Sequence, residues 1–376
     1  MRERLHQMLL KEFRQIFRDP RMRTVIFIAP VVQMLLFGYA VTTDVRNVPT
    51  AVYDLDNSAA SRDLVAKLAG SGYFQVVEHV ASPERIRELL DGGDVLLALE
   101  IPPGFQADLD AGRTAALQLI VDGTDSNTAG IALDYSASIT GDFSREVLRR
   151  RILRQTGAEP PDTPVELRWR AWFNQSLESR NFYIPGVIAM IVSLVTLMLT
   201  SMAIVREKEI GTMEQLLVSP VRPIEFILGK TLPFVLISLA DVVLITIVGV
   251  FWFGVPIRGN LLLLFFSTTL YLLTTLSAGL LISTISRTQQ QAMMSTFLFY
   301  FPAVLLSGMV FPIANMPQVV QWLTLLNPLR YFLIIIRGVF LKGVGAGILW
   351  PQMLALAVLG TLMLVLASRR FRKTLA

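Results

Sequence analysis

The chain has 376 residues, of which 53% are hydrophobic and only 17% are charged, with a net charge of +5. This composition is typical of an integral membrane protein, in which basic residues set topology more often than they bind nucleic acid. The absence of cysteine excludes disulfides and thiolate metal sites. The two histidines, His6 and His79, lie far apart in sequence and leave little material for a zinc site or a histidine-based triad.

The N-terminal segment, residues 1–23, carries an amphipathic pattern. Apolar residues, Phe13 and Phe17 among them, recur at i, i+3 and i+4 spacing, and basic residues take the other faces. This pattern predicts a helix that lies in the membrane interface and is ended by Asp19-Pro20. A solvated helix packed on a soluble domain is the alternative, which is disfavoured because an apolar stretch follows within a few residues.

Six apolar stretches are long enough to cross a bilayer core of ~30 Å as helices. The first is also a candidate signal peptide, with Gly38 and Ala40 at a cleavage spacing. If it is retained, the basic N-terminus, the loop after the second stretch and the basic tail 369–376 share the cytoplasmic side, as the positive-inside rule expects. We therefore interpret it as an anchor and predict six spans: Thr24–Val41, Tyr183–Val205, Leu232–Gly254, Leu261–Ile285, Met293–Ile313 and Ile348–Ala367.

Residues 44–180 form a polar insert, which this topology places outside the cytoplasm. Strand-like stretches (VPTAVYDLD, FQVVEHV, DVLLALEIP, AALQLIVDG) alternate with helical ones, and a long amphipathic helix follows over about 127–155. This order predicts a small α/β domain. Two polar clusters, the Asp54, Asp56 and Asn57 group and the stretch DGTDSN, could bind a cation. Turn and N-cap roles fit them better, since the second lacks the oxygen spacing and glycine of an EF-hand loop.

The loop EKEIGTMEQLLVSP, residues 207–220, holds more hydrogen-bonding groups than a simple turn needs. From about 208 to 218 its apolar residues share one face, which predicts a helix along the membrane surface, closed by a Ser-Pro pair. Acidic side chains suit anionic lipid poorly and favour a protein partner that presents Arg or Lys, although solvated glutamates are the alternative. The glutamates concerned are Glu207, Glu209 and Glu214.

One ionisable residue, Asp241, lies deep in a predicted span. It indicates either a proton, cation or cationic-substrate site, or a protonated or hydrogen-bonded carboxyl that joins helices. No second acidic residue in the spans completes a relay, which favours the structural role. The Gly-Lys-Thr at 229–231 lacks the earlier glycine of a phosphate-binding loop, and no GxSxG or HExxH motif is present. We therefore expect no covalent chemistry from this chain.

The segment 314–345 includes YFLIIIRGVFL, which is too short to cross a bilayer and contains Arg337. Counting it as a span would move the basic tail to the outer side. We therefore expect re-entrant or interfacial structure there.

Three stretches carry a resemblance to a known family: REKEIGTMEQLLVSP, LLISTISRTQQQA and LLSGMVFPIANMPQVVQWLTLLNPLRYF. With the six spans and the large insert after the first, nearly the whole chain resembles the permease subunits of type-2 ABC exporters. It most resembles bacterial permeases of multidrug exporters encoded beside an ATPase and a periplasmic adaptor. The resemblance implies an α-helical, multi-pass protein of the bacterial inner membrane with an extracytoplasmic α/β domain.

In this family the loop after the second span docks on a cytosolic ATPase. The resemblance thus implies that ATP and Mg bind that partner, and that this chain is not an enzyme and holds no cofactor. It also implies a second permease subunit, identical or paralogous, with a periplasmic adaptor as a further candidate partner. The implied ATPase-coupling residues are Glu207, Glu209, Gly211, Thr212, Glu214, Ser219 and Pro220, with Phe13 and Phe17 on a connecting helix beside them.

The implied cargo is a hydrophobic or amphipathic compound such as a drug, carried through a cavity lined mainly from the second and fifth spans. The stretch 307–310 aligns with the apolar plug that closes the exit in related exporters, and ordinary helix packing is the alternative. Aromatic residues of the fifth span (Phe297, Phe299, Tyr300, Phe301) could line the cavity or face lipid. The residues assigned to the substrate path and gate are Asp241, Phe299, Phe301, Met309 and Val310.

Two other functions stay open on the sequence. An ion-coupled secondary transporter would use Asp241 and would need no ATPase. A membrane receptor or scaffold would act through the external domain and would tolerate loss of residues 207–220.

Overall fold

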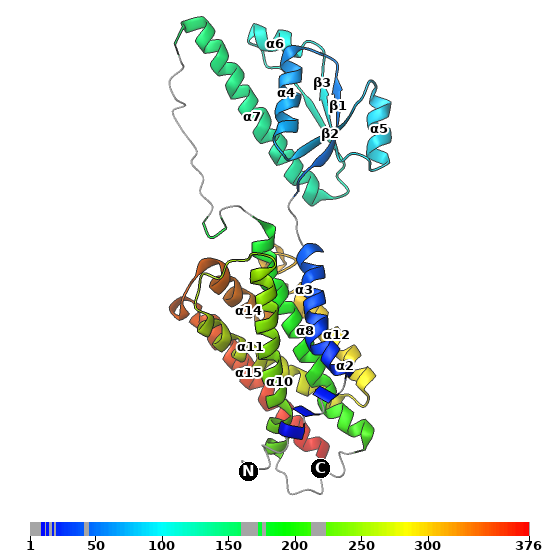
Figure 1. Cartoon of the computed structure of the whole chain (residues 1–376), viewed down its shortest axis with the longest axis vertical. Coiled ribbons are helices and arrows are strands. Elements are labelled where there is room, and N and C mark those ends of the chain that lie inside the picture. The colour runs from blue at the N-terminus through cyan, green and yellow to red at the C-terminus, as the bar shows by residue number, and fades with distance from the viewer. Residues whose placement is uncertain are drawn as a thin grey trace. The chain divides into compact units, whose positions relative to one another are not determined.

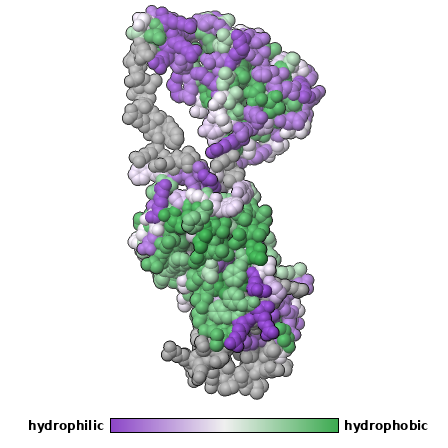
Figure 2. All heavy atoms as spheres, in the orientation of Figure 1, coloured by the Kyte–Doolittle hydropathy of each residue, from purple (hydrophilic) through white to green (hydrophobic). Residues whose placement is uncertain are grey.

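The computed structural model describes residues 9–11, 13–14, 17–18, 20–40, 45–158, 172–174, 178–211 and 223–375, without the side chains of 21, 223–228 and 371–375. The chain divides into two compact units. Thr43–Trp169 is called the α/β unit, and Met1–Thr42 with Arg170–Ala376 is called the helical unit. Their surfaces differ, since the visible face of the α/β unit is mostly hydrophilic and that of the helical unit is largely apolar (Figure 2).

The α/β unit follows the predicted alternation of strands and helices (Figure 1). Its sheet has the order β2-β1-β3-β4, in which β1 is parallel to β2 and β3, and β4 is antiparallel to β3. Its position outside the cytoplasm stays a prediction. The elements are β1 (Val48–Asp54), α4 (Ala59–Gly70), β2 (Phe74–His79), α5 (Pro83–Asp91), β3 (Leu97–Ile101), α6 (Phe105–Ala111), β4 (Gln118–Val121) and α7 (Ser126–Thr156).

Helices cover both faces of this sheet. On one face α4, α6 and α7 contribute buried residues such as Leu64, Phe105 and Phe143 to a common core with Leu97 and Leu99. On the other face α5 packs Ile86 and Leu89 against the sheet. Because successive residues of a strand point to opposite faces, a strand buried on both faces is mostly apolar, as β3 is apart from Glu100.

The polar clusters of the α/β unit act in turns and caps. Asp54 accepts the backbone N–H groups of Asp56 and Asn57 at 3.1 and 2.9 Å, and Asp125 accepts those of Asn127 and Thr128 at the start of α7. These bonds occupy the backbone donors that a helix or strand end leaves without partners. The turn and N-cap interpretation is confirmed for both clusters.

Asp56 connects β1 to α6. Its carboxylate accepts the backbone N–H of Gly104 at 2.8 Å and that of Gln106 at 3.0 Å. Hydrogen bonds from the Ser58 side chain and the Gln106 backbone hold the pKa of Asp56 below its usual value. Such bonds favour the charged form of a carboxyl, so they stabilise the fold only while Asp56 is ionised.

The helical unit begins with α2 (Pro20–Arg23), a π-helical segment η1 (Thr24–Ile28) and α3 (Ala29–Ala40). Three long helices and a shorter one follow: α8 (Ser179–Ile210), α10 (Pro223–Phe251), α11 (Leu261–Ile285) and α12 (Gln289–Leu305). The remaining elements are η2 (Ile313–Asn315), α13 (Gln318–Leu323), η3 (Thr324–Leu326), α14 (Pro328–Arg337), η4 (Gly338–Lys342) and α15 (Ala346–Leu375).

Four helices among the described residues are long and apolar enough to span a membrane: Ser179–Ile210, Gly229–Phe251, Leu261–Ile285 and Ala346–Arg370. They confirm four of the six predicted spans. The first prediction coincides with a shorter apolar helix, Thr24–Ala40. The fifth prediction is not confirmed, because α12 is not among the described helices that are long and apolar enough to span a membrane. It ends at Leu305, before a turn with Gly308 at φ 83°.

The segment 314–345 contains a sharp bend. The helical stretches Gln318–Leu326 and Pro328–Lys342 meet at 82°, which is the geometry of a broken span or a re-entrant loop. If they count as one span, the described residues contain five. Asn327 stabilises the bend, since its Oδ1 accepts Leu329 N at 3.1 Å and its Nδ2 donates to Ala303 O at 2.6 Å.

Arg337, in the last turn of α14, is accommodated by an aromatic partner. Its guanidinium lies 3.7 Å from the ring centroid of Phe182, and its Nε donates to Phe182 O at 3.3 Å. A cation over an aromatic face is attracted by the ring quadrupole, and the attraction strengthens when water is excluded. This contact joins α14 to the start of α8.

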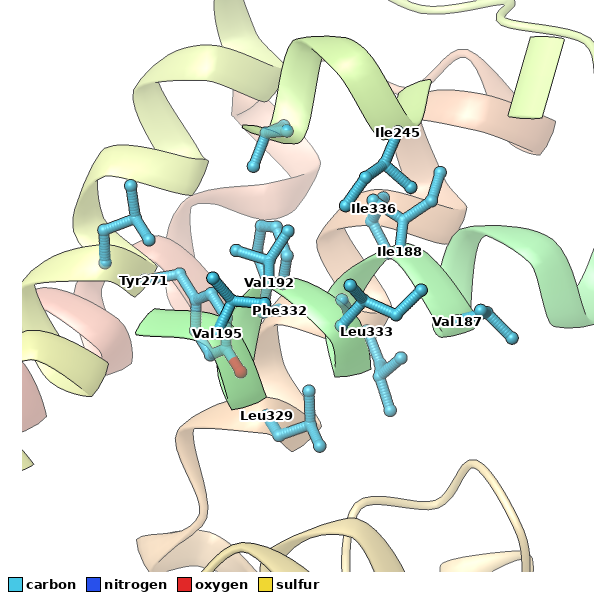
Figure 3. Packing of buried hydrophobic residues seen from close by; sticks show 14 of the residues in the cluster. Val187, Ile188, Val192, Val195, Ile245, Tyr271, Leu329, Phe332, Leu333 and Ile336 are labelled. Atoms are coloured by element: carbon cyan, nitrogen blue, oxygen red, sulfur yellow. The ribbon is translucent and has the colours of Figure 1, made fainter. Parts of the chain in front are cut away.

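The core of the helical unit forms around α8. In its most apolar window 72% of α8 is buried, against 17% for α15. Figure 3 shows Val187, Ile188, Val192 and Val195 of α8 among Ile245 of α10, Tyr271 of α11 and four residues of α14 (Leu329, Phe332, Leu333, Ile336). The Tyr271 and Phe332 rings stack with centroids 4.2 Å apart.

Close approach of α8 and α11 depends on Gly279. A Cβ atom at this position would lie 2.0 Å from Thr200 Oγ1 and 3.1 Å from Leu197 O. Small residues at such crossings let helix backbones pack tightly. In lipid this packing drives helix association, because the lipid tails are as apolar as the helices and the hydrophobic effect contributes little.

We predict that Gly279→Val lowers the stability of the full chain by about 1–3 kcal/mol, because the added atoms overpack the α8–α11 contact. Thermal unfolding of the detergent-purified protein measures the loss. Gly279→Ala should lower the stability less than Gly279→Val does. Adding Thr200→Ala to Gly279→Ala should restore part of the lost stability, because it removes the atom nearest to the new Cβ. Full stability of Gly279→Val would show that these helices do not approach as described.

We predict that acid weakens the contact between β1 and α6. Since the folded-state pKa of Asp56 is lowered, its contribution is complete above the unfolded value of ~3.9 and is lost as the pH falls through the folded value. Hydrogen–deuterium exchange of residues 104–111 should show Asp56→Ala reducing protection about tenfold at pH 7. The difference between variant and wild type should shrink as the pH falls below ~4, whereas a constant difference would contradict the role of the charge.

Candidate functional site at the base of the 212–222 loop

The predicted docking loop begins inside α8. Residues 207–210 form the last turn of that helix, which ends where Gly211 adopts the left-handed conformation at φ 78°. The prediction of a separate surface helix starting near residue 208 is therefore wrong at its start. The rest of the loop, with predicted coupling residues Thr212, Glu214, Ser219 and Pro220, lies outside the described residues.

Glu207 takes part in a buried ion pair. Lys230 Nζ donates to Glu207 Oε1 at 2.6 Å, and both residues are only 4% exposed. Lys11 Nζ lies 3.7 Å from the same oxygen and remains largely exposed. Because α8 and α10 are the two helices that the loop connects, this pair closes the base of the loop. The N-terminal segment meets it there.

The next two residues reach two other helices. Lys208 Nζ donates to Thr284 O at 3.3 Å and to Ser286 O at 3.5 Å, at the C-terminal end of α11. Glu209 Oε1 accepts Gln289 N at 2.8 Å, and its Oε2 accepts the Gln289 side-chain amide, at the start of α12. A cation at a helix C-terminus and an anion at an N-terminus both complement the helix dipole.

The predicted connecting-helix residues pack against the helical unit. The Phe13 and Phe17 rings stack with centroids 6.3 Å apart, and Phe17 stacks on Phe27 at 6.1 Å. Phe13 also packs against the main core cluster. Their predicted contact with an ATPase stays a prediction, and the structure adds that both rings contact residues of this chain.

Sequence reasoning missed the internal partners of the glutamates. The structure brings Glu207 and Glu209 to Lys230 and Gln289, so these acidic groups are engaged within the chain. A signal for the first pair was present, because a lysine at the edge of an apolar helix is rarely buried without a partner. Nothing in the local pattern pointed to Gln289, which is 80 residues away from Glu209.

The predicted substrate-path residues do not form one surface. Phe299, Phe301 and Val310 are 37%, 59% and 49% exposed, whereas Met309 is 6% exposed. Met309 packs against Gly186 of α8, where a Cβ atom would lie 2.2 Å from its sulfur. The 307–310 turn is thus anchored to α8 through Met309 and exposes Val310.

Asp241 is buried in the interior of the helical unit. It is 1% exposed, and neither carboxyl oxygen has a hydrogen-bond partner among the described residues. Burying a polar group without such a bond costs free energy, so the group does not join helices by hydrogen bonding as one interpretation expected. A residue kept at such a cost inside a membrane helix is a candidate for function.

We predict that Asp241→Leu, which keeps the approximate shape, raises stability by about 1–3 kcal/mol because it removes the buried polar atoms. Thermal unfolding of the purified full chain measures this, with Asp241→Asn as the polar control. A lower unfolding temperature for Asp241→Leu would show that the carboxyl has a stabilising partner.

Comparison with known proteins identifies the family. Residues 21–369 match the sequence profile of the "ABC-2 family transporter protein" family. The chain is 35% identical over 359 residues to an Escherichia coli "Probable multidrug ABC transporter permease YbhR", covering 96% of this chain and 95% of that protein. It is 34% identical to the Escherichia coli permease YbhS, named in the same words, over 90% and 89% of the two chains.

A third Escherichia coli protein, "Inner membrane transport permease YhhJ", is 32% identical over 97% of this chain and 96% of its own length. These matches extend over both units and over the ends of α8 and α10 that form the candidate site. The chain therefore belongs to the ABC-2 family of transporter proteins, as a multi-pass membrane permease.

Proposed function

We propose that this chain is the permease subunit of an ATP-driven exporter of the bacterial inner membrane. A separate ATPase subunit would hydrolyse ATP, and two permease subunits would enclose the substrate path. The observation that carries the proposal is the family match over residues 21–369 in a chain whose sequence has no phosphate-binding loop. Lys230, of the Gly-Lys-Thr sequence, lies in α10 and is paired with Glu207.

The loop 212–222 is the proposed ATPase contact. The helices that flank it, α8 and α10, are joined by the Glu207–Lys230 pair. Since Glu207 and Glu209 are engaged within the chain, we assign the contact with a basic group of the ATPase to Glu214. In this arrangement the loop, both chain termini and the basic tail lie in the cytoplasm, and the α/β unit lies outside.

A second permease subunit is supported by the exposed side of α12. Met294, Leu298, Phe301 and Leu305 are 64%, 78%, 59% and 48% exposed and recur at i, i+4, i+7 and i+11, on one face of the helix. An apolar face of this kind either contacts lipid or packs on another helix, and two facing copies would bring these residues to a shared path. Phe299, Phe301 and Val310 would then contact the cargo.

The proposed cargo is a hydrophobic or amphipathic compound. The names of the Escherichia coli relatives YbhR and YbhS describe them as multidrug permeases. The exposed aromatic side chains of α12 offer van der Waals contact without demanding one hydrogen-bonding pattern, which suits varied apolar compounds.

We predict that the purified chain hydrolyses no ATP alone, and that its partner ABC ATPase subunit binds it and gives vanadate-sensitive hydrolysis. Glu214→Lys should weaken this binding at least tenfold (~1.4 kcal/mol), because it reverses a charge at the contact. Binding of the fluorescently labelled ATPase to the chain in nanodiscs measures the affinity.

Glu84→Lys, an exposed change of the same type on α5, is the matched control and should leave ATPase binding unchanged. Equal affinity for wild type, Glu214→Lys and a chain with residues 213–218 replaced by glycine and serine would contradict the docking role. Ethidium efflux driven by a proton gradient without the ATPase would instead support an ion-coupled transporter.

A further inference from the structure

Three consecutive residues at the end of α8 each contact a different segment of the helical unit. Glu207 pairs with Lys230 of α10, Lys208 donates to the C-terminal carbonyl groups of α11, and Glu209 accepts from the start of α12. Successive residues of an α-helix point about 100° apart, so three in a row extend in three directions. The last turn of α8 therefore contacts α10 at Lys230, the C-terminal end of α11 and the start of α12.

We propose that Glu207, Lys208 and Glu209 form a transmission hub that transfers movement of the 212–222 loop to α10, α11 and α12 together. This inference rests on the proposed function for the event that moves the loop. The three residues are positioning residues, since they act through the helices they hold. Their role differs from that of the loop itself, which makes the contact with the ATPase.

The Glu207–Lys230 pair prevents the loop from absorbing the movement. A loop between two unlinked helices could be displaced while the helices spread apart, and little would reach the bundle. A buried ion pair at 2.6 Å links the two helices at the base of the loop, and breaking it leaves an uncompensated buried charge. Displacement of the loop must therefore carry the ends of α8 and α10 with it.

Lys208 and Glu209 extend the connection to the turn between α11 and α12. Lys208 binds the carbonyl oxygens of Thr284 and Ser286, and Glu209 binds Gln289 just beyond the turn. Lys208 thus binds the C-terminal end of α11 and Glu209 binds the N-terminal end of α12, on the two sides of a short turn. The sign of each charge complements the dipole of the helix end that it contacts. Rotation of the α8 end would move this turn as a rigid piece.

Lys11 adds the N-terminal segment to the hub. Its Nζ lies 3.7 Å from Glu207 Oε1, on the exposed side of the buried pair. This second cation is attracted to the same carboxylate and links the N-terminal segment to Glu207. Through this contact, movement of the segment that carries Phe13 and Phe17 would also be coupled to the hub.

The test uses a spin label in the turn region, because the chain contains no cysteine and a single introduced one is labelled cleanly. A nitroxide at Gln290→Cys, an exposed position next to Gln289, is placed in the full chain assembled with its ATPase in nanodiscs. Its spectrum is compared without nucleotide and with ATP and vanadate. In the otherwise unchanged chain we expect a clear change in label mobility.

Glu209→Ala and Glu207→Gln should each reduce this change at least fivefold while the affinity for the ATPase stays within twofold. The exchanged pair, Glu207→Lys with Lys230→Glu, should restore at least half of the nucleotide-dependent change in label mobility. Adding Lys11→Glu to this pair should restore more of that change. Glu84→Ala on α5 removes a comparable charge elsewhere and should have no effect. Glu209 is exposed, so its variant tests the hub even if the buried variants fold poorly.

Three results would overturn the hub. One is an unaltered spectral change in Glu209→Ala and Glu207→Gln, and another is a parallel loss of ATPase affinity in these variants, which would make them docking residues. The third is an unresponsive label in an assembly that binds and hydrolyses ATP. Failure of the unmodified chain to bind the ATPase at all would refute the proposed function itself, and the hub with it.

Discussion

Burial of α8 on nearly every side is the constraint on which the rest of the helical unit depends. The helix contacts α3, α10, α11, α12 and α14, and its residues supply much of the main core. A helix so enclosed can accept close neighbours only where side chains are small or well matched, as at Gly279 and Gly186. The same enclosure leaves its charged end among the ends of its neighbours.

At the C-terminal end of α8, ion pairs and hydrogen bonds of Glu207, Lys208 and Glu209 take the place of apolar packing. Apolar packing is non-directional, so it specifies the partner and register of a helix less strictly than a directed bond does. Ion pairs and bonds to helix termini fix both the partner and the register, since each works at one distance and direction. The helical unit thus combines an apolar core around α8 with an end whose arrangement is specified by charge.

Much of this fold follows from sequence periodicity, and the exceptions have physical reasons. Alternating strand and helix patterns gave the order of the α/β unit, and four long apolar runs gave four spans. The boundaries failed where a helix continues through polar residues, as α8 does to Ile210, or stops within an apolar run, as α12 does at Leu305. Periodicity reports which face is apolar, and the end of a helix depends on caps and tertiary contacts.

The sequence predicted where the candidate site lies, but it predicted only some of the contacts that its residues make. The stretch 207–220 was recognised as unusual because it holds more hydrogen-bonding and acidic groups than a simple turn needs. Lys230 carried a signal, as a lysine beside an apolar helix, whereas Thr284 and Gln289 could not be predicted, since helix packing brings them to α8 over separations of 76 and 80 residues. Glutamates that looked available to a partner protein are partly committed within the chain.

The π-helical segment η1 determines how far α2 is rotated about the helix axis relative to α3. A π-helix fits one more residue into a turn than an α-helix, so the segment shifts the angle at which residues on either side face the bundle. Removing one residue between Thr24 and Ile28 would convert this turn to regular helix and rotate the preceding segment by about 100° relative to α3. The residues of α2 would then face the bundle at a different angle, although none of them had been altered. The number of residues in η1, rather than their identity, thus fixes the angle about the helix axis between α2 and α3.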